Sequence, residues 1–212
     1  RDALAHDGQS FAAKAATYRE AAIATAAYHD DEWNDAGYYV FRGDASFLEY
    51  AGQDQPLNQS NAMGLALLAL LDATRDPVYL ARATALAQRL RAMMSPGPGG
   101  GLVWNYWGGA YAAPGEDISH AALNVEFAVQ AAARGVVFSD ADLDGLATTF
   151  LTNVYLDDQS FSDFIGGGPV NDPAYRAQIG RWLALTPSRG AIYAAVHDAY
   201  LRDYPAADIG SG

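Results

Sequence analysis

The segment LNQSNAMGLALLALLDATRDPVYLARATALAQRLRAM, residues 57–93, decides the fold of this chain. After a polar first turn, residues 62–73 are almost entirely apolar, which predicts a helix that is buried on every side. A short turn at 74–77 leads to a second segment, in which apolar residues follow one helical stripe. The arginines of this second segment are expected to face solvent. Together the two segments predict an inner helix joined to an outer helix.

The same hairpin pattern follows twice more along the chain. Residues 119–134 predict a second buried helix, and Ser139 with Asp142 forms a capping-box pattern for its outer partner. Residues 172–183 and 187–200 predict a third pair, because their apolar positions again fall on single helical stripes. The chain is therefore expected to be built from helical hairpins.

An all-α fold of about seven helices follows from these patterns. The inner helices begin near residues 57, 119 and 172, a spacing that is compatible with a structural repeat. Residues 10–29 predict one more helix, which lacks an inner partner. The odd number indicates an N-terminal truncation, or a missing wall supplied by self-association or by a partner chain. Residues 1–212 are treated as a single domain, since a chain of this length can bury one substantial core.

The long loops all precede inner helices. They cover residues 34–56, 96–118 and 156–171, and in an array of helical hairpins this places them on one face. Within them, residues 37–42 predict a short strand and residues 97–101 a flexible hinge. Function is expected on this face, because long loops on a helical scaffold commonly carry binding residues.

Charge and composition exclude several classes of protein. The net charge is −12, with one lysine beside twelve arginines, so the chain lacks the basic surface of a nucleic-acid binder and is repelled by anionic membranes. The chain has no apolar run of 18 residues, so no membrane span is expected. The absence of cysteine excludes disulfides and thiolate metal sites, and the scattered histidines show no zinc-ligand spacing, so neither a metal nor a cofactor is expected. Without an initiator methionine or a signal peptide, the sequence is interpreted as a processed chain or a fragment.

The loop before the second inner helix is rich in aromatic rings and hydrogen-bonding groups. It forms part of WNYWGGAYAAPGEDISHAALNVEF, residues 104–127. Flat apolar rings beside carboxylates and amides suit sugars, which have an apolar face and a hydroxylated edge. We expect the loop to bind a glycan through Trp104, Asn105, Tyr106, Trp107 and Tyr111. Alternatively, the rings only close the open end of the helical bundle.

Three polar residues follow one stripe of the second inner helix. Asp117, His120 and Asn124 are spaced i, i+3 and i+7, which places them on the same face. His120 is a candidate base that Asp117 orients, with Asn124 binding substrate. Alternatively, Asp117 caps the helix and His120 is a hydrogen-bonded core residue. Burying three idle polar side chains on one stripe is costly, which favours a function.

Two adjacent acids, Glu116 and Asp117, are candidates for the general acid of a glycosidase. Such an enzyme needs a second carboxyl group at a distance, which has to come from elsewhere in the chain. Candidates for this second acid are Glu126, Asp163 and Asp35. Alternatively, the two acids only complement the dipole of the helix that they precede.

The amides Asn58 and Asn61 open the first inner helix and are expected on the same face as His120. In an elimination reaction, the carboxylate of a uronate must be neutralised before C5 loses its proton, and amides can do this by hydrogen bonding. A tyrosine or histidine then acts as base, and the candidates are Tyr106, Tyr111 and His120. The alternative is ordinary N-capping by Asn58 or Ser60.

This alternation of helices resembles the α/α-toroid of polysaccharide lyases, uronyl C5-epimerases and related glycoside hydrolases. The likeness rests on the LNQSNA segment at 57–62 and the EDISH segment at 116–120, and it covers residues 57–155. It implies an incomplete toroid, a polysaccharide or oligosaccharide partner, and a secreted or periplasmic bacterial protein. The leading expectation is a lyase on uronate-containing glycans. A hydrolase with Glu116 or Asp117 as acid and a non-catalytic glycan-binding or assembly module are the alternatives.

Overall fold

The computed structural model describes residues 11–108, 115–156, 160–168 and 173–203, and these are mostly helical. The α-helices are α2 (Ala12–Tyr28), α3 (Leu57–Thr74), α4 (Pro77–Met93), α5 (Ile118–Ala132), α6 (Asp140–Thr149), α7 (Pro173–Arg176) and α8 (Ala191–Asp203). The remaining short helices are the 3₁₀-helices η1 (Asp30–Glu32), η2 (Pro98–Gly100) and η5 (Ile179–Leu185), and the π-helix η4 (Phe150–Val154). Strands β1 (Ser95–Pro96) and β2 (Leu102–Val103) form an antiparallel pair. The all-α fold expected from the sequence is confirmed.

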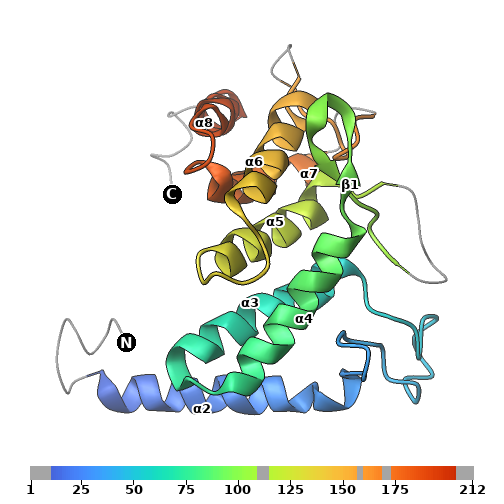
Figure 1. Ribbon diagram of the computed structural model, residues 1–212, viewed down its shortest axis with the longest axis vertical. Helices are drawn as coiled ribbons and strands as arrows, with labels where there is room; N and C mark the ends of the chain where they lie inside the picture. Colours follow the sequence, from blue (N-terminus) through green and yellow to red (C-terminus); the bar gives the residue numbers. More distant parts are fainter. Residues whose placement is uncertain (1–10, 109–114, 157–159, 169–172, 204–212) are drawn as a thin grey trace.

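The helices stack as a layered array, with α2 and α8 at opposite ends (Figure 1). In the middle row, α3 packs on α5 and α5 packs on η5. Helix α4 covers α3, and α8 packs on η5. Among the described helices, none is long and apolar enough to cross a bilayer.

Helices α3 and α5 pack closely together at Gly64. Gly64 of α3 faces the fully buried ring of Phe127 of α5, and a Cβ at Gly64 would lie 2.6 Å from Cε2 of that ring. Glycine therefore allows the two backbones to approach closely at this point. The contact holds together the two helices whose first turns carry the polar residues singled out in the sequence.

Helix α3 is not buried on every side, so that expectation is wrong. Its side toward α5 is buried, but Ala62, Ala66 and Ala69 are exposed along the other side. Helix α2 is the neighbour there, and a hollow of about 430 Å³ separates the two helices. Because alanine side chains are short, they do not fill the space between α2 and α3.

The arginines of α4 hold loops in place and do not simply face solvent, as the sequence led us to expect. The Nη2 atom of Arg89 donates to Oδ2 of Asp54 at 2.6 Å, and its guanidinium lies 3.7 Å from the ring centroid of Tyr38. Arg82 pairs with Asp30 of η1. These contacts attach η1 and the loop before α3 to helix α4.

The start of α6 has the capping box that its sequence predicts. Ser139 and Asp142 exchange hydrogen bonds between side chain and backbone. Arg91, near the end of α4, donates from Nε to Oδ1 of Asp142 at 2.7 Å. The same aspartate therefore completes the capping box of α6 and ties this helix to α4.

The third hairpin differs from the predicted pair of long helices. Only α7, with four residues, and the 3₁₀-helix η5 form where one helix was expected. The buried residues of η5 are Ile179, Trp182 and Leu185, which recur every three residues. This spacing fits the three residues per turn of a 3₁₀-helix better than the wider turn of an α-helix.

The short strand was expected in the wrong loop. Residues 37–42 make only isolated bridges, which pair Trp33 with Tyr39 and Val40 with Asp54. The expected hinge at 97–101 is instead the turn between β1 and β2, closed by a hydrogen bond from Gly97 N to Gly101 O at 2.8 Å.

Candidate functional site

The loops before α3 and α5 meet at the first turns of these two helices. The backbone N–H of Leu57 donates to the carbonyl of Tyr106 at 3.3 Å, and that of Ile118 donates to the carbonyl of Asp163 at 3.0 Å. An isolated bridge also pairs Asp117 with Phe164. Segments far apart in the sequence therefore surround one place, the start of α5.

A hydrogen-bonded chain of buried side chains lies beneath this place. Asn61 donates to Oδ1 of Asn124 at 2.7 Å, and Asn124 donates to Oε2 of Glu116 at 3.0 Å. Trp104 donates from its indole to the same Oε2 at 2.9 Å. All four side chains are buried, and the bond between Asn61 and Asn124 joins α3 to α5.

Glu116 lies under the surface of the site and is not exposed to a substrate. Its relative exposure is 0%, and its Oε1 atom has no hydrogen-bond partner among the described residues. Burial, followed by the nearby Asp117 carboxylate, raises the pKa of Glu116 well above its usual range, although the bonds from Trp104 and Asn124 act the other way. In this position Glu116 does not reach a glycosidic bond.

Asp117 both caps α5 and orients His120. Its Oδ1 atom accepts the backbone N–H groups of Ser119 and His120 at 2.9 and 3.0 Å, and its Oδ2 atom meets Nδ1 of His120. The side chain of His120 is 38% exposed, whereas that of Asp117 is 9% exposed. The capping role and the orienting role, which the sequence left as alternatives, therefore occur together.

Tyr106 lies against the exposed side of this pair. The centroids of the Tyr106 and His120 rings are 4.8 Å apart, with an angle of 42° between the ring planes. Burial, with smaller contributions from Glu116 and Asp117, raises the pKa of the Tyr106 hydroxyl. The two rings form the accessible part of the site, and the carboxylate of Asp117 is buried beside them.

The two tryptophans are part of the interior, which corrects the expectation of exposed stacking surfaces. Trp104 is 3% exposed and Trp107 is 7% exposed. The indole of Trp107 donates to the carbonyl of Asp54, and its ring lies 4.7 Å from that of Tyr50 in an edge contact. Large rings bury much apolar area, so they close this end of the array.

The remaining candidates of the aromatic loop are an exposed amide and a tyrosine. Asn105 accepts the backbone N–H of Gly115 on its Oδ1 atom at 3.1 Å, and this bond joins the two ends of the segment between them. Tyr111 lies outside the described residues.

Asn58 does not cap α3. The N-cap of this helix is Pro56, without a side-chain cap, and the Oδ1 atom of Asn58 is buried without a hydrogen-bond partner among the described residues.

Among the acids considered as a second carboxyl group, Glu126 pairs with Arg181 at 3.7 Å.

The site has the composition of a metal-ligand cluster, which the sequence reasoning missed. One ligand atom from each of Glu116, Asp117 and His120 lies within 4.8 Å of the others. The signal was present in the EDISH segment, where two acids and a histidine fall within one helical turn. We had interpreted the acids as dipole partners or glycosidase acids, and the histidine as a base.

Two hollows lie near the loops that precede α3 and α5. One of about 240 Å³ is bordered by Trp104, Asn105 and Gly115. Another, of about 580 Å³, lies beside the first turns of α3 and includes Gln59 and Phe41 in its lining. Both offer space next to the loops that surround the site.

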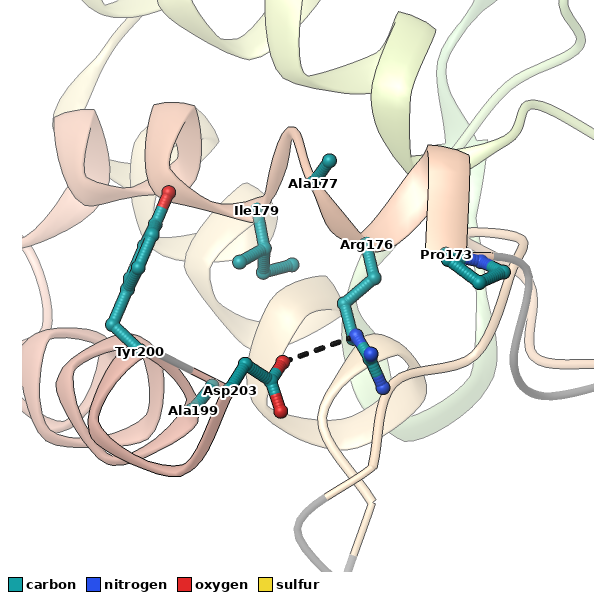
Figure 2. A pocket seen from close by; sticks show the side chains of 7 residues that line it. All are labelled: Pro173, Arg176, Ala177, Ile179, Ala199, Tyr200 and Asp203. Atoms are coloured by element: carbon teal, nitrogen blue, oxygen red, sulfur yellow. Dashed lines mark ion pairs between the residues drawn. The ribbon is translucent and has the colours of Figure 1, made fainter. Parts of the chain in front are cut away.

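A smaller hollow of about 150 Å³ lies between α7, η5 and the end of α8 (Figure 2). Arg176 and Asp203 form an ion pair there at 3.1 Å, and the hydroxyl of Tyr200 points toward η5. Because Arg176 is held by Asp203, the hollow offers a substrate little free charge, and we attach no function to it.

Comparisons of the chain with known protein families, with curated proteins and with solved structures found no match. The function is therefore inferred from the geometry of the site.

Proposed function

We propose that the chain is a polysaccharide-active enzyme, a lyase on uronate-containing glycans, in which the Tyr106–His120 pair supplies the base. One observation carries the proposal. The imidazole of His120 is oriented by Asp117, lies against the ring of Tyr106 and is partly exposed, while the layer of polar side chains beneath it is buried. A side chain held in one orientation at an accessible position is what proton abstraction requires.

The reaction needs one proton removed and one bond broken. The base takes the proton from C5 of the uronate, the electron pair forms the C4–C5 double bond, and the bond between C4 and the glycosidic oxygen breaks. The departing oxygen takes up a proton. Neutralising the carboxylate attached to C5 makes the first step easier, because negative charge develops on that group. We propose Asn58 for this role, because it lies in the first turn of α3 and its side chain does not cap that helix.

The buried position of Glu116 favours a lyase over a hydrolase. A glycosidase acid has to contact the leaving oxygen, with its partner carboxyl on the other side of the bond. Glu116 has no exposed surface, and Asp117 is occupied by the cap and by His120. A base built from rings at the surface, above a fixed carboxylate, suits elimination better.

The test is incubation of the protein with a panel of uronate polysaccharides. A lyase produces new ultraviolet absorbance from the unsaturated uronate, and His120→Ala and Tyr106→Phe should each lower its rate by at least about 100-fold, the scale of a general base. His197→Ala is the matched control, because His197 is an exposed histidine beside an aspartate on α8. New reducing ends without this absorbance indicate a hydrolase instead. If both signals are absent across the whole panel, the lyase and the hydrolase are both contradicted.

The proposal extends to architecture and location. We propose that α3, α5 and the α7–η5 segment are inner helices of an incomplete α/α-toroid, with α2, α4, α6 and α8 as outer helices. Packing of α3 on α5 and of α5 on η5 supports this assignment. A secreted or periplasmic location goes with a polysaccharide substrate. Self-association remains a prediction, which sedimentation velocity tests.

A further inference from the structure

The starting observation is a buried carboxylate oxygen without a partner. The Glu116 carboxylate accepts hydrogen bonds from the side chains of Trp104 and Asn124, and both arrive at the same oxygen, Oε2. Its other oxygen, Oε1, is buried and has no hydrogen-bond partner among the described residues. Buried polar atoms in folded proteins are almost always satisfied, so such an atom points to a bound water or ion.

The second observation is what surrounds that carboxylate. Asp117 and His120 each bring a ligand atom to within 4.8 Å of Glu116 and of each other. Metal–ligand bonds of about 2.0–2.2 Å place the ligands of one ion at most about 4.4 Å apart. Around a tetrahedral ion neighbouring ligands are about 3.4 Å apart, so the three ligand atoms need to approach one another by up to about 1.4 Å to hold one ion.

We propose that Glu116, Asp117 and His120 form a binding site for a divalent transition-metal ion, Mn²⁺ or Zn²⁺, in which Oε1 of Glu116 is a ligand. Two carboxylates balance the charge of a divalent ion. An imidazole ligand favours transition metals, whereas Mg²⁺ and Ca²⁺ prefer sites made of oxygen atoms alone. The donors to Oε2, Trp104 and Asn124, hold the Glu116 carboxylate in place, as second-shell partners do in known metal sites.

The ion would keep positions open for water or substrate. Three protein ligands leave at least one position of a tetrahedral ion free, and His120 is on the exposed side of the cluster. The inference goes beyond the proposed function and does not depend on it. If both hold, His120 is a ligand in the loaded protein, the ion neutralises the uronate carboxylate, and Tyr106 is left as the base.

The test is an isothermal titration calorimetry experiment, in which MnCl₂ or ZnCl₂ is titrated into the chelator-treated full chain. We expect one ion per chain, and the same cluster should give Co²⁺ visible absorption bands. Glu116→Gln and His120→Ala should each weaken binding by at least about 100-fold, because even second-shell changes cost 10- to 100-fold. His197→Ala should bind as the unsubstituted chain does, and MgCl₂ and CaCl₂ should bind far more weakly.

Two results overturn the metal site. One is no binding of either ion by the unsubstituted chain, and the other is unchanged affinity in both site variants. Glu116→Gln alters a buried network, so its fold is checked by circular dichroism. If it does not fold, His120→Ala decides the question, because that side chain is partly exposed. No glycan is present in the titration, so failure of the metal site and failure of the lyase proposal are distinguishable.

Discussion

Replacing Gly64 by alanine tests the packing of α3 on α5, because two effects act on it in opposite directions. In a helix interior, alanine is favoured over glycine by about 1 kcal/mol. Against this, a Cβ at Gly64 would lie 2.6, 2.9 and 3.0 Å from three ring atoms of Phe127. Carbon atoms in contact are normally about 3.5–4.0 Å apart, so the ring or the helix must move by about 1 Å.

The packing effect should win. Phe127 is fully buried, so its ring cannot move toward solvent. Overpacking of a well-packed core costs about 1–3 kcal/mol. Because the new Cβ would overlap with three ring atoms, we expect the upper end of this range, about 3 kcal/mol. After subtracting the helix preference, Gly64→Ala should lower the free energy of unfolding by about 2 kcal/mol.

The assay is urea unfolding followed by far-ultraviolet circular dichroism, with an unchanged dependence on urea concentration as the sign of a simple stability effect. Gly43→Ala is the control, because a Cβ there meets nothing within 4 Å. In a Phe127→Leu background, the penalty of Gly64→Ala should shrink, since the smaller side chain leaves room. A Gly64→Ala protein as stable as the original, or more stable, would refute the close approach of α3 and α5.

Two further substitutions test how the helices are held. Asp142→Ala removes the carboxylate half of the capping box of α6 and the ion pair with Arg91, and should lower the free energy of unfolding by about 1–2 kcal/mol at neutral pH. Burial acts to raise the pKa of Asp142, but the hydrogen bonds from Ser139 and the charge of Arg91 outweigh it, so this pKa is lowered. The stabilisation is therefore fully present above the usual carboxyl pKa of 3.8, and it is lost as the pH falls through the lowered pKa. Urea unfolding at neutral and acidic pH checks both points, and an equal difference from the original protein at both would contradict them. Trp182→Phe removes the buried indole bond to the carbonyl of Ile118 at 3.1 Å and should cost about 2 kcal/mol, whereas an unchanged urea midpoint would show that this bond contributes little.

The positions of the helices were predictable because their signals are local. Apolar residues at helical spacing and the capping box of Ser139 and Asp142 depend on neighbours within a few residues. The structure places α3, α4, α5 and α6 where those patterns predicted them. The 3₁₀-helix η5 was missed because apolar residues near 3.6-residue spacing were interpreted as an α-helix. The buried residues in fact recur at every third position.

The burial of individual side chains was less predictable, since it depends on contacts far apart in the sequence. Trp104 and Trp107 resembled a sugar platform, but their indole groups bond to Glu116 and to the backbone of Asp54. Arg89 resembled a solvent-facing residue, yet the loop before α3 passes beside it. Nothing in a stretch of sequence states which distant segment will cover it.

Only the part of the candidate site that lies within one helix could be predicted from the sequence, because the other contacts join distant segments. The spacing of Asp117, His120 and Asn124 placed them on one helix face, and the structure shows the first two in contact with each other. The link from Asn124 to Glu116 and Trp104 depends on the fold of the preceding loop, which the sequence pattern does not describe.

The central claim is that the start of α5 is where this chain meets a glycan. The most direct measurement is the change in backbone amide chemical shifts when galacturonate or guluronate oligosaccharides are added to isotope-labelled protein. The account predicts the largest changes at residues 104–107 and 115–124, with smaller ones at the first turn of α3. Changes confined to the hollow beside Arg176 and Asp203, or none with any oligosaccharide, would contradict it.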